Sequence, residues 1–364
     1  MVRTKKPNEK TNIVEEQSTS MSEAELDLIR QEQESIDQLE IETTPEVNLD
    51  ISQLDGVGAV TAKKLTEFGV TSLIDICIRG GREISEITGV AKSKADGWVF
   101  NAQKILEDNN LIRKSDMDVI DLMEYQSNLP LLGTKCEALD ELLGGGVKPE
   151  CTYEIYGEFG SGKTQFCNTL VAQALSEGQN VVWVDCEDTF RPTRILEIMK
   201  AREMVETRED MEKALERIKY FYTPNTEQLL GTINALSKVM EEKRPRVVIV
   251  DGAIGQFREE YLGRGTLADR QNQIARLMTH IKNISYYFRT TVVYTNQVQT
   301  DPSVMFGDPV KPIGGNVVGH AATYRIYFKK SGKKRVARMV DSPEHPQADA
   351  EYILNAKGID NKEE

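Results

Sequence analysis

Apolar strands alternate with amphipathic helices along the C-terminal part of the chain. From about residue 150 onward, short runs rich in Val, Ile and Tyr are separated by longer stretches with helical periodicity. Continuous apolar strands are buried on both faces, so the pattern predicts an α/β fold with a mainly parallel sheet between helices. Ligands bind such sheets at the carboxyl ends of the strands. The predicted strands are 153–156, 181–184, 220–222, 247–250, 291–295 and 324–328.

A small helical domain is predicted over residues 51–110, where two glycine turns interrupt the helical periodicity. The first turn is Leu54-Asp55-Gly56-Val57-Gly58, and a looser copy spans 87–91. A tight Gly-x-Gly turn between short helices resembles a helix-hairpin-helix unit, whose backbone N–H groups can contact a nucleic-acid phosphate without reading bases. The simpler interpretation is a turn between packed helices. We predict a DNA contact at Gly56, Val57 and Gly58.

The segments on either side of this domain differ from it in composition. Residues 1–50 contain 13 acidic and 5 basic residues and few aromatic ones. They offer too little apolar surface to offset the entropy of ordering, so a mostly disordered acidic tail is expected. Residues 111–132 are predicted to be a linker with a helical stretch over 119–125. The α/β part is expected to span 133–364.

Composition narrows the class of protein. The net charge is −13, but the first 50 residues account for −8 of it, and 325–338 holds seven basic residues and no acidic one. The mean charge therefore does not exclude a nucleic-acid partner. The five cysteines form no C-x-x-C pair, which predicts neither disulfides nor a zinc site. Without a membrane-length apolar run or a signal core, we expect a cytoplasmic protein that has no membrane partner.

A phosphate-binding loop follows the first predicted strand. The run from Gly157 to Thr164 fits G-x-x-x-x-G-K-[ST], and a helix is predicted after it. Converging backbone N–H groups and the helix N-terminus would hold phosphate. Lys163 is expected to reach the β- and γ-phosphates, and Thr164 to ligate Mg²⁺, so ATP and Mg²⁺ are the expected cofactors. The expected nucleotide contacts are Gly157, Glu158, Phe159, Gly160, Ser161, Gly162, Lys163, Thr164 and Gln165.

Polar residues end three further strands and complete the candidate catalytic site. Asp251 ends the strand 247–250 and would hold the Mg²⁺ hydration shell opposite Thr164. Glu187, after the strand 181–184, is the candidate general base, with Asp185 and Asp188 as alternatives. Gln297, after the strand 291–295, carries a neutral amide that can hydrogen-bond the γ-phosphate. Taken singly, each is also compatible with an ordinary polar residue at a strand end.

Two long polar connections are candidate DNA-binding loops. Loops of such length in a compact domain are usually functional or disordered. Arginines on a flexible loop suit the backbone of single-stranded DNA, although surface loops without a ligand would fit these features equally well. The first loop, 257–270, contains Arg258, Arg264 and Arg270, and the second, 298–319, is rich in Gly and Pro and contains Gly314 and Gly315.

Five segments in order resemble the archaeal RadA recombinases, members of the RecA superfamily of strand-exchange proteins. The resemblance begins at about residue 52 and runs to the C-terminus. It implies a helix-hairpin-helix domain before a RecA-like ATPase core. It also implies filaments on single-stranded DNA, and pairing with duplex DNA in recombination and repair. Rings are a further assembly that it implies in the absence of DNA. The segments are 157–165, 189–195, 260–271, 296–298 and 306–316.

The resemblance also assigns roles to single residues. It implies that Glu187 is the catalytic base, that Gln297 senses the γ-phosphate, and that Arg194 packs on adenine. The DNA loops would be 258–270 and about 300–317, and His320 would couple the γ-phosphate to the second loop. Asp341 and Pro343 would belong to a cap over the ATP of a neighbouring subunit.

Some positions depart from the family pattern. Asp188 replaces a glycine, Gly252 replaces the usual serine, and Gln347 replaces an acidic residue, which puts a cap-bound monovalent cation in doubt. The family's Phe-x-x-Ala anchor in the linker is also missing. A gapless alignment puts Asp116 and Val119 there. A one-residue slip gives Met117 and Ile120, which we predict to be the subunit anchor, because a buried unpaired carboxylate is costly and Met fits irregular cavities. The strand 115–120 is then expected to add to the sheet edge of a neighbouring subunit.

Three other functions would also use a phosphate-binding loop of this kind. A recombinase paralogue that binds ATP and acts as a mediator or regulator without strand exchange is the main alternative. Such paralogues often lack the helical domain and one of the loops, both of which this chain has. A hexameric helicase would need a separate ring-linker region, and a small-molecule kinase would leave 52–110 unexplained.

Overall fold

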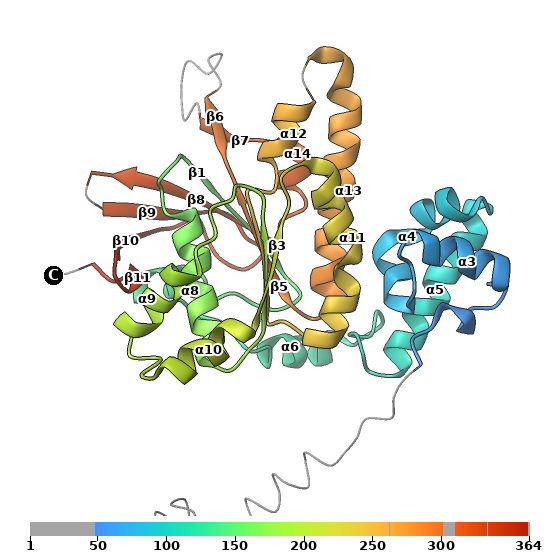
Figure 1. The fold of residues 1–364 in the computed structure, drawn as a ribbon, viewed down its shortest axis with the longest axis horizontal. Helices are drawn as coiled ribbons and strands as arrows, with labels where there is room; N and C mark the ends of the chain where they lie inside the picture. The colour runs from blue at the N-terminus through green and yellow to red at the C-terminus, as the bar shows by residue number, and fades with distance from the viewer. Residues whose placement is uncertain (1–47, 262, 301–309, 333, 363–364) are drawn as a thin grey trace, which may run out of the picture. The chain divides into compact units, whose positions relative to one another are not determined.

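The computed structural model describes residues 48–261, 263–300, 310–332 and 334–362 (Figure 1). From Leu49 onward the chain forms one compact unit. Nearly all of the predicted acidic tail, residues 301–309 of the second predicted DNA loop, and Lys333 lie outside the described residues.

Three helices form the N-terminal helical segment. Ser72 and Asp75 make a capping box at the start of α4, which satisfies two backbone N–H groups. Gly56 has a φ of 81°, in the left-handed region that favours glycine. The Nε1 of Trp98 donates to the carbonyl of Asp55 at 2.8 Å, so the predicted glycine turn is held against α5. The elements are η1 (Ile51–Gln53), α3 (Ala59–Glu67), α4 (Leu73–Thr88) and α5 (Lys92–Asp108).

The linker carries one helix, α6 (Val119–Ser127), which confirms the predicted helical stretch. Tyr125 fixes this helix to the rest of the chain. The guanidinium groups of Arg113 and Arg289 lie 5.9 and 5.5 Å from its ring centroid, and its hydroxyl contacts Glu150. A short helix, α7 (Glu137–Leu142), then leads into the sheet.

A nine-stranded sheet has the order β11-β10-β9-β8-β1-β5-β4-β2-β3. The six strands from β8 to β3 are parallel, as predicted, and they are the six predicted from apolar runs: β1 (Thr152–Gly157), β2 (Val181–Asp185), β3 (Ile218–Tyr222), β4 (Val247–Asp251), β5 (Thr291–Asn296) and β8 (Tyr324–Ser331). Five further strands were not predicted from apolar runs: the antiparallel β9 (Lys334–Asp341), β10 (Asp349–Asn355) and β11 (Gly358–Asp360), and the separate pair β6 (Val298–Thr300) and β7 (Val310–Pro312).

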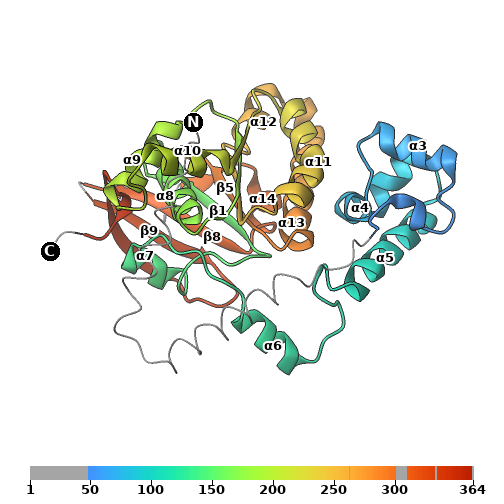
Figure 2. The ribbon, with the colours of Figure 1, turned by 60° about the horizontal axis from the view of Figure 1, so that its bottom comes forward.

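Helices cover both faces of this sheet (Figures 1 and 2). Alternate residues of each strand enter two apolar clusters. Trp183 and Ile249 pack in the cluster with α8 (Lys163–Ser176) and α9 (Pro192–Ala201), whereas Val184 and Val250 pack in the cluster with α11 (Thr226–Lys243) and α13 (Leu267–Tyr287). The predicted α/β fold is therefore confirmed. The remaining helices are α10 (Arg208–Glu216), α12 (Gly255–Glu260), η2 (Arg264–Thr266) and α14 (Gly315–Gly319).

Helix α4 packs against α13 through a buried carboxylate, Glu83. Its oxygens accept hydrogen bonds from Arg79 at 2.5 Å, Arg276 at 2.5 Å and His280 at 2.9 Å. Burial alone would raise the pKa of Glu83, but hydrogen bonds and charges from His280 and Arg79 outweigh it and lower the pKa to about 2. The apolar core also continues from this segment to α11 and α13. The division at residue 110 therefore remains a proposal.

Candidate functional site

The predicted phosphate-binding loop joins β1 to α8. Gly160 and Gly162 have φ values of 71° and 111°, which only glycine adopts readily. The Nζ of Lys163 donates to the carbonyls of Gly157 at 2.9 Å and Glu158 at 3.1 Å. Burial lowers the pKa of Lys163. The loop is thus formed, with its lysine folded back over its own backbone.

Asp251 ends β4 directly opposite the start of α8. Its Oδ2 accepts from the hydroxyls of Thr164 at 3.0 Å and Thr189 at 3.3 Å, and its Oδ1 accepts from Thr295 at 2.5 Å. Burial raises the pKa of Asp251 to about 6. Among the described residues no group of three or more His, Cys, Asp or Glu could hold a metal ion. A hydroxyl beside one carboxylate instead suits Mg²⁺, which usually keeps several waters and binds substrate phosphates.

The three carboxylates after β2 have different surroundings. Asp185 is buried and accepts the backbone N–H groups of Glu187, Thr189 and Phe190, so it holds the turn. Asp188 is exposed with a φ of 54°, a left-handed conformation that Asp tolerates better than most residues. Glu187 is exposed, and its Oε1 accepts from Nε2 of Gln297 at 2.9 Å. This arrangement favours Glu187 as the general base.

Gly252 follows Asp251 and adjoins the candidate base. Its φ is 86°, and a Cβ built there would lie 2.5 Å from Cγ of Glu187. A serine at this position, as in the family pattern, would force the Glu187 side chain to move. The glycine therefore leaves room for Glu187 in the position that it occupies.

Arg194 lies at the rim of the phosphate-binding loop. Its Nε donates to the side-chain oxygen of Gln165 at 2.9 Å, and its Nη2 donates to the carbonyl of Asn355 at 2.7 Å. It thereby ties the β10–β11 hairpin to α8. The place beside α8 suits the predicted adenine contact, although here the guanidinium is bound by protein oxygens.

Residues from both predicted DNA loops line one cavity of about 250 Å³, formed by Arg258, Arg270, Gly314 and Gly315 with their neighbours. The Nε of Arg270 is buried and has no hydrogen-bond partner among the described residues. Arg264 begins η2, but its side chain is not described.

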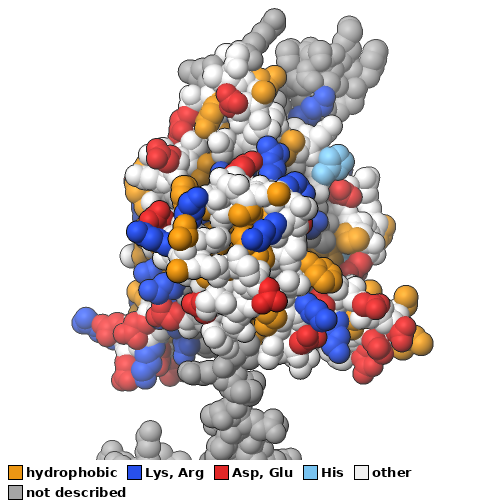
Figure 3. Space-filling model, turned by 90° about the vertical axis from the view of Figure 1, so that its right-hand side faces the viewer, with side chains coloured by type: hydrophobic (Ala, Val, Ile, Leu, Met, Phe, Trp, Pro, Cys, Tyr) orange, Lys and Arg blue, Asp and Glu red, His pale blue; other side chains and the backbone are white. Residues whose placement is uncertain are grey.

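Gly56, Val57 and Gly58 belong to the helical segment and do not line this cavity. Viewed from the side of that segment, the molecule shows interspersed basic and acidic side chains (Figure 3).

The predicted coupling residue and one predicted cap residue line a common cavity. His320 follows α14, is exposed, and lines a cavity of about 300 Å³ together with Asp341 at the end of β9. Pro343 is exposed two residues later.

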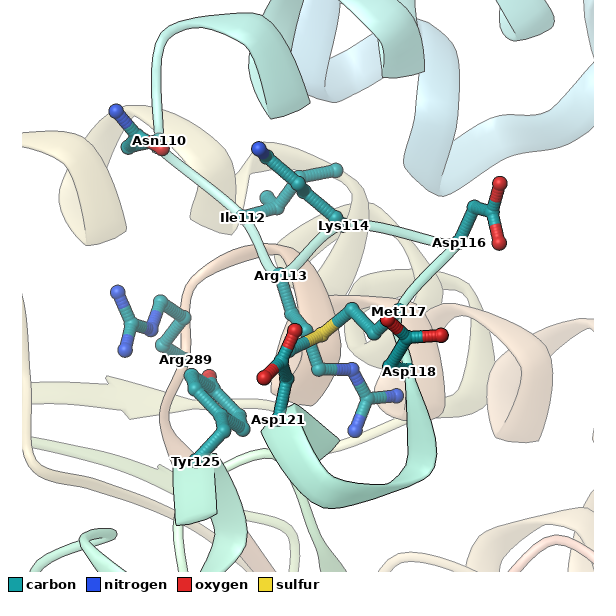
Figure 4. Close-up of a pocket in the computed structure, with 10 residues that line it drawn as sticks. All are labelled: Asn110, Ile112, Arg113, Lys114, Asp116, Met117, Asp118, Asp121, Tyr125 and Arg289. Carbon is teal, nitrogen blue, oxygen red and sulfur yellow. The ribbon is translucent and has the colours of Figure 1, made fainter. Parts of the chain in front are cut away.

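The predicted anchor residues lie in the linker. Met117 is half-buried and lines a cavity of about 570 Å³ together with Arg113, Asp121 and Tyr125 (Figure 4). Ile120 is 73% exposed. We expected residues 115–120 to form a strand on a neighbouring sheet. In this structure residues from Val119 onward are already helical, so at most 115–118 could extend without unwinding α6.

The basic run 325–338 forms the hairpin of β8 and β9, in which Ser331 pairs with Lys334. Part of it lies beside the phosphate-binding loop: a Cβ built at Gly160 would be 2.9 Å from Nζ of Lys330. Of the three threonines that donate to Asp251, Thr164 was predicted as a site residue, whereas Thr189 and Thr295 were not. Thr295 lies at the end of a predicted strand, and that position was the signal that could have found it.

Comparisons with known proteins agree with this geometry. The family model described as Rad51 matches residues 126–362. A protein of Cenarchaeum symbiosum (strain A), "DNA repair and recombination protein RadA", is 40% identical over 324 residues, which cover 87% of this chain and 80% of that protein. No helix of the described part is both long and apolar enough to cross a bilayer. The chain therefore belongs to the Rad51 family, and it is a RadA-like DNA-dependent ATPase and strand-exchange recombinase of DNA repair.

Proposed function

We propose that the chain binds ATP and Mg²⁺ between the phosphate-binding loop and Asp251, and in that state assembles as a helical filament on single-stranded DNA and pairs it with duplex DNA. The observation that carries the proposal is the meeting of four groups at the carboxyl edge of the sheet. The loop follows β1, Glu187 follows β2, Asp251 ends β4 and Gln297 follows β5.

Each group has a distinct task in this proposal. Lys163 exchanges its two carbonyl acceptors for phosphate oxygens, which its position at the start of α8 allows. Thr164 and Asp251 would hold Mg²⁺ and its waters, and the bound cation would supply positive charge beside the phosphates. Glu187 orients and deprotonates the attacking water, a task usually worth about 10²–10⁴ in rate. Gln297 leaves Glu187 and hydrogen-bonds the γ-phosphate.

The DNA contacts are proposed at the two loops and the glycine turn. Arg258, Arg264 and Arg270 would neutralise phosphates, and the backbone at 314–315 can approach closely because it bears no side chains. The cavity shared by both loops supports a single DNA path over α12, the start of α13 and α14. Gly56 and Gly58 would add backbone N–H contacts to duplex DNA.

Assembly and location belong to the same proposal. A filament needs a head-to-tail contact that does not close on itself, whereas rings would form if the contact closed without DNA. We assign the contact to Met117 and Ile120 on one side and to the cap residues Asp341 and Pro343 on the other. The five cysteines are all unpaired, which supports a reducing, cytoplasmic location.

Electron microscopy with single-stranded DNA and a non-hydrolysable ATP analogue tests the proposal. We expect helical filaments from the unaltered chain and none from Lys163→Ala. Rings or monomers under these conditions would refute the filament. They would favour the alternative in which the chain is a mediator that binds ATP without exchanging strands.

A further inference from the structure

Three consecutive residues at the end of β5 bind three different carboxylates. Thr295 donates to Asp251 at 2.5 Å, Asn296 donates to Glu154 at 2.8 Å, and Gln297 donates to Glu187 at 2.9 Å. Two of these carboxylates belong to the proposed hydrolysis site. Glu154 does not, and the proposed function gives neither it nor Asn296 a task.

Glu154 is a fully buried charge in the middle of the sheet. It lies on β1, three residues before the phosphate-binding loop, and is 0% exposed. Its second oxygen pairs with Nε of Arg325 on β8 at 2.7 Å. A buried carboxylate without partners would be costly, so Asn296 and Arg325 together make its position possible.

Asn296 also holds the end of the second predicted DNA loop. Its Nδ2 donates to the carbonyl of Ile313 at 2.8 Å, and the N–H of Ile313 donates to the carbonyl of Gln297 at 3.0 Å. Ile313 directly precedes Gly314 and Gly315. The chain thus leaves β5 at Asn296 and returns to the same residue, with β6 and β7 paired in between.

The same network reaches α14, which follows this loop. A Cβ built at Gly319 would lie 3.1 Å from the Arg325 guanidinium, so the two are in close contact. On β5 the hydroxyl of Tyr294 donates to the carbonyl of Val318 at 3.3 Å. Both ends of the loop and the helix before His320 are therefore anchored to β1, β5 and β8.

The side chains of Thr295, Asn296 and Gln297 alternate between the two faces at the end of β5. Successive side chains point to opposite faces, so Thr295 and Gln297 face the nucleotide side. Asn296 shares its face with Tyr294, which packs in the cluster that contains Ile313 and Val318. A shift of this strand end that moves Gln297 must also move Asn296, whose hydrogen bonds hold it to Glu154 and to the loop.

We propose that Asn296, Glu154 and Arg325 form a positioning relay that couples the state of the nucleotide site to the second DNA loop. The relay rests on the proposed function. It turns a change of partner at Gln297 into a displacement of Ile313, because the Asn296 amide donates both to Glu154 and to the carbonyl of Ile313. The other atom of this amide, Oδ1, is buried without a partner among the described residues.

The test measures a coupling factor, the affinity for a labelled poly-dT oligonucleotide with a non-hydrolysable ATP analogue divided by the affinity without it. Fluorescence anisotropy gives both affinities, and phosphate release gives the ATPase rate. The full chain must first show a factor above 1, and factors of about 5 to 150 are typical of coupled sites. A factor of 1 in the unaltered chain would count against the proposed function rather than against the relay alone.

Asn296→Ala should bring the coupling factor to about 1 and abolish stimulation of the ATPase by DNA, while affinity for the ATP analogue stays within about twofold. The matched control is Asn180→Ala, because Nδ2 of Asn180 also donates to a backbone carbonyl, that of Lys243, at 2.7 Å, but lies remote from the site. The control should keep the coupling factor. A normal factor in Asn296→Ala, or equal losses in both variants, would overturn the relay.

A second variant keeps the test decisive if Asn296→Ala does not fold. Glu154→Gln preserves side-chain size and removes the charge, so it should lower the coupling factor with little change in affinity for the analogue. Full coupling in Glu154→Gln would refute the relay.

Discussion

Glu83→Gln should destabilise the packing of α4 on α13, because it removes the charge that three donors share. The pKa of Glu83 falls from 4.5 to about 2 on folding. Each pKa unit corresponds to about 1.4 kcal/mol, so the charged form contributes about 3 kcal/mol at neutral pH. Gln keeps the shape and one acceptor oxygen, but it leaves Arg79 and Arg276 without a buried anion. We therefore expect a loss of about 3 kcal/mol.

The pH dependence of this loss has a definite sign. The folded protein keeps Glu83 ionised at pH values where the unfolded chain protonates it. Its contribution is thus fully present above pH 4.5 and is lost as the pH falls toward about 2. The difference in unfolding free energy between the unaltered chain and Glu83→Gln should shrink over that window.

Urea unfolding followed by tryptophan fluorescence measures the effect. The chain has two tryptophans: Trp98 in α5 and Trp183 in β2. In a Trp183→Phe background the signal comes from the helical segment alone. Glu86→Gln on the same helix is the matched control, because its pair with Arg82 is exposed, and exposed pairs are worth about 0.2–1 kcal/mol. Equal losses in the two variants, or a loss independent of pH, would refute the reasoning.

The remaining predictions concern the proposed site and assembly. Lys163→Ala should abolish ATP binding or turnover, and DNA-stimulated phosphate release at the normal rate would exclude the assignment. Glu187→Gln should bind ATP and DNA but hydrolyse ATP about 10²–10⁴-fold more slowly. A loss of that size in Asp188→Asn, with none in Glu187→Gln, would identify Asp188 as the general base instead. Arg270→Ala should reduce the slope of log affinity for single-stranded DNA against log salt by about 0.7, and an unchanged slope would remove it from the DNA path. Met117→Glu should give monomers that bind ATP but form no filaments in the electron microscope, and normal filaments would place the anchor elsewhere.

The parallel strands could be predicted because a strand that is buried on both faces consists of consecutive apolar residues. The strand β4, Val247–Asp251, is buried at every position. The strand β9 differs, because Lys334, Arg335 and Arg338 interrupt its apolar residues and it lies toward the edge of the sheet. Its pairing with β8 decides its conformation, and that pairing is invisible in local composition. The three-residue strands β6 and β7 carry too few residues for any period.

At the site, too, local sequence predicted the residues at strand ends but not those whose partners lie far away along the chain. Asp251 and Gln297 follow apolar strands, so their place at the carboxyl edge follows from the fold class alone. Glu154 lies inside a predicted strand, where a charged side chain is normally expected to face solvent. Its partners are Asn296 and Arg325, 142 and 171 residues away along the chain. No local pattern identifies such a pair.

Two of the departures from the family pattern meet at one side chain, Glu187. Asp188 has a φ of 54°, a left-handed conformation that glycine adopts without strain and Asp tolerates better than most residues. Gly252, at a φ of 86°, removes a side chain whose Cβ would lie 2.5 Å from Glu187 Cγ. Position 252 therefore decides whether Glu187 can rest against Gln297, because any side chain there would meet Cγ of Glu187 in its present position. Gly252→Ser should thus force Glu187 out of its hydrogen bond with Gln297.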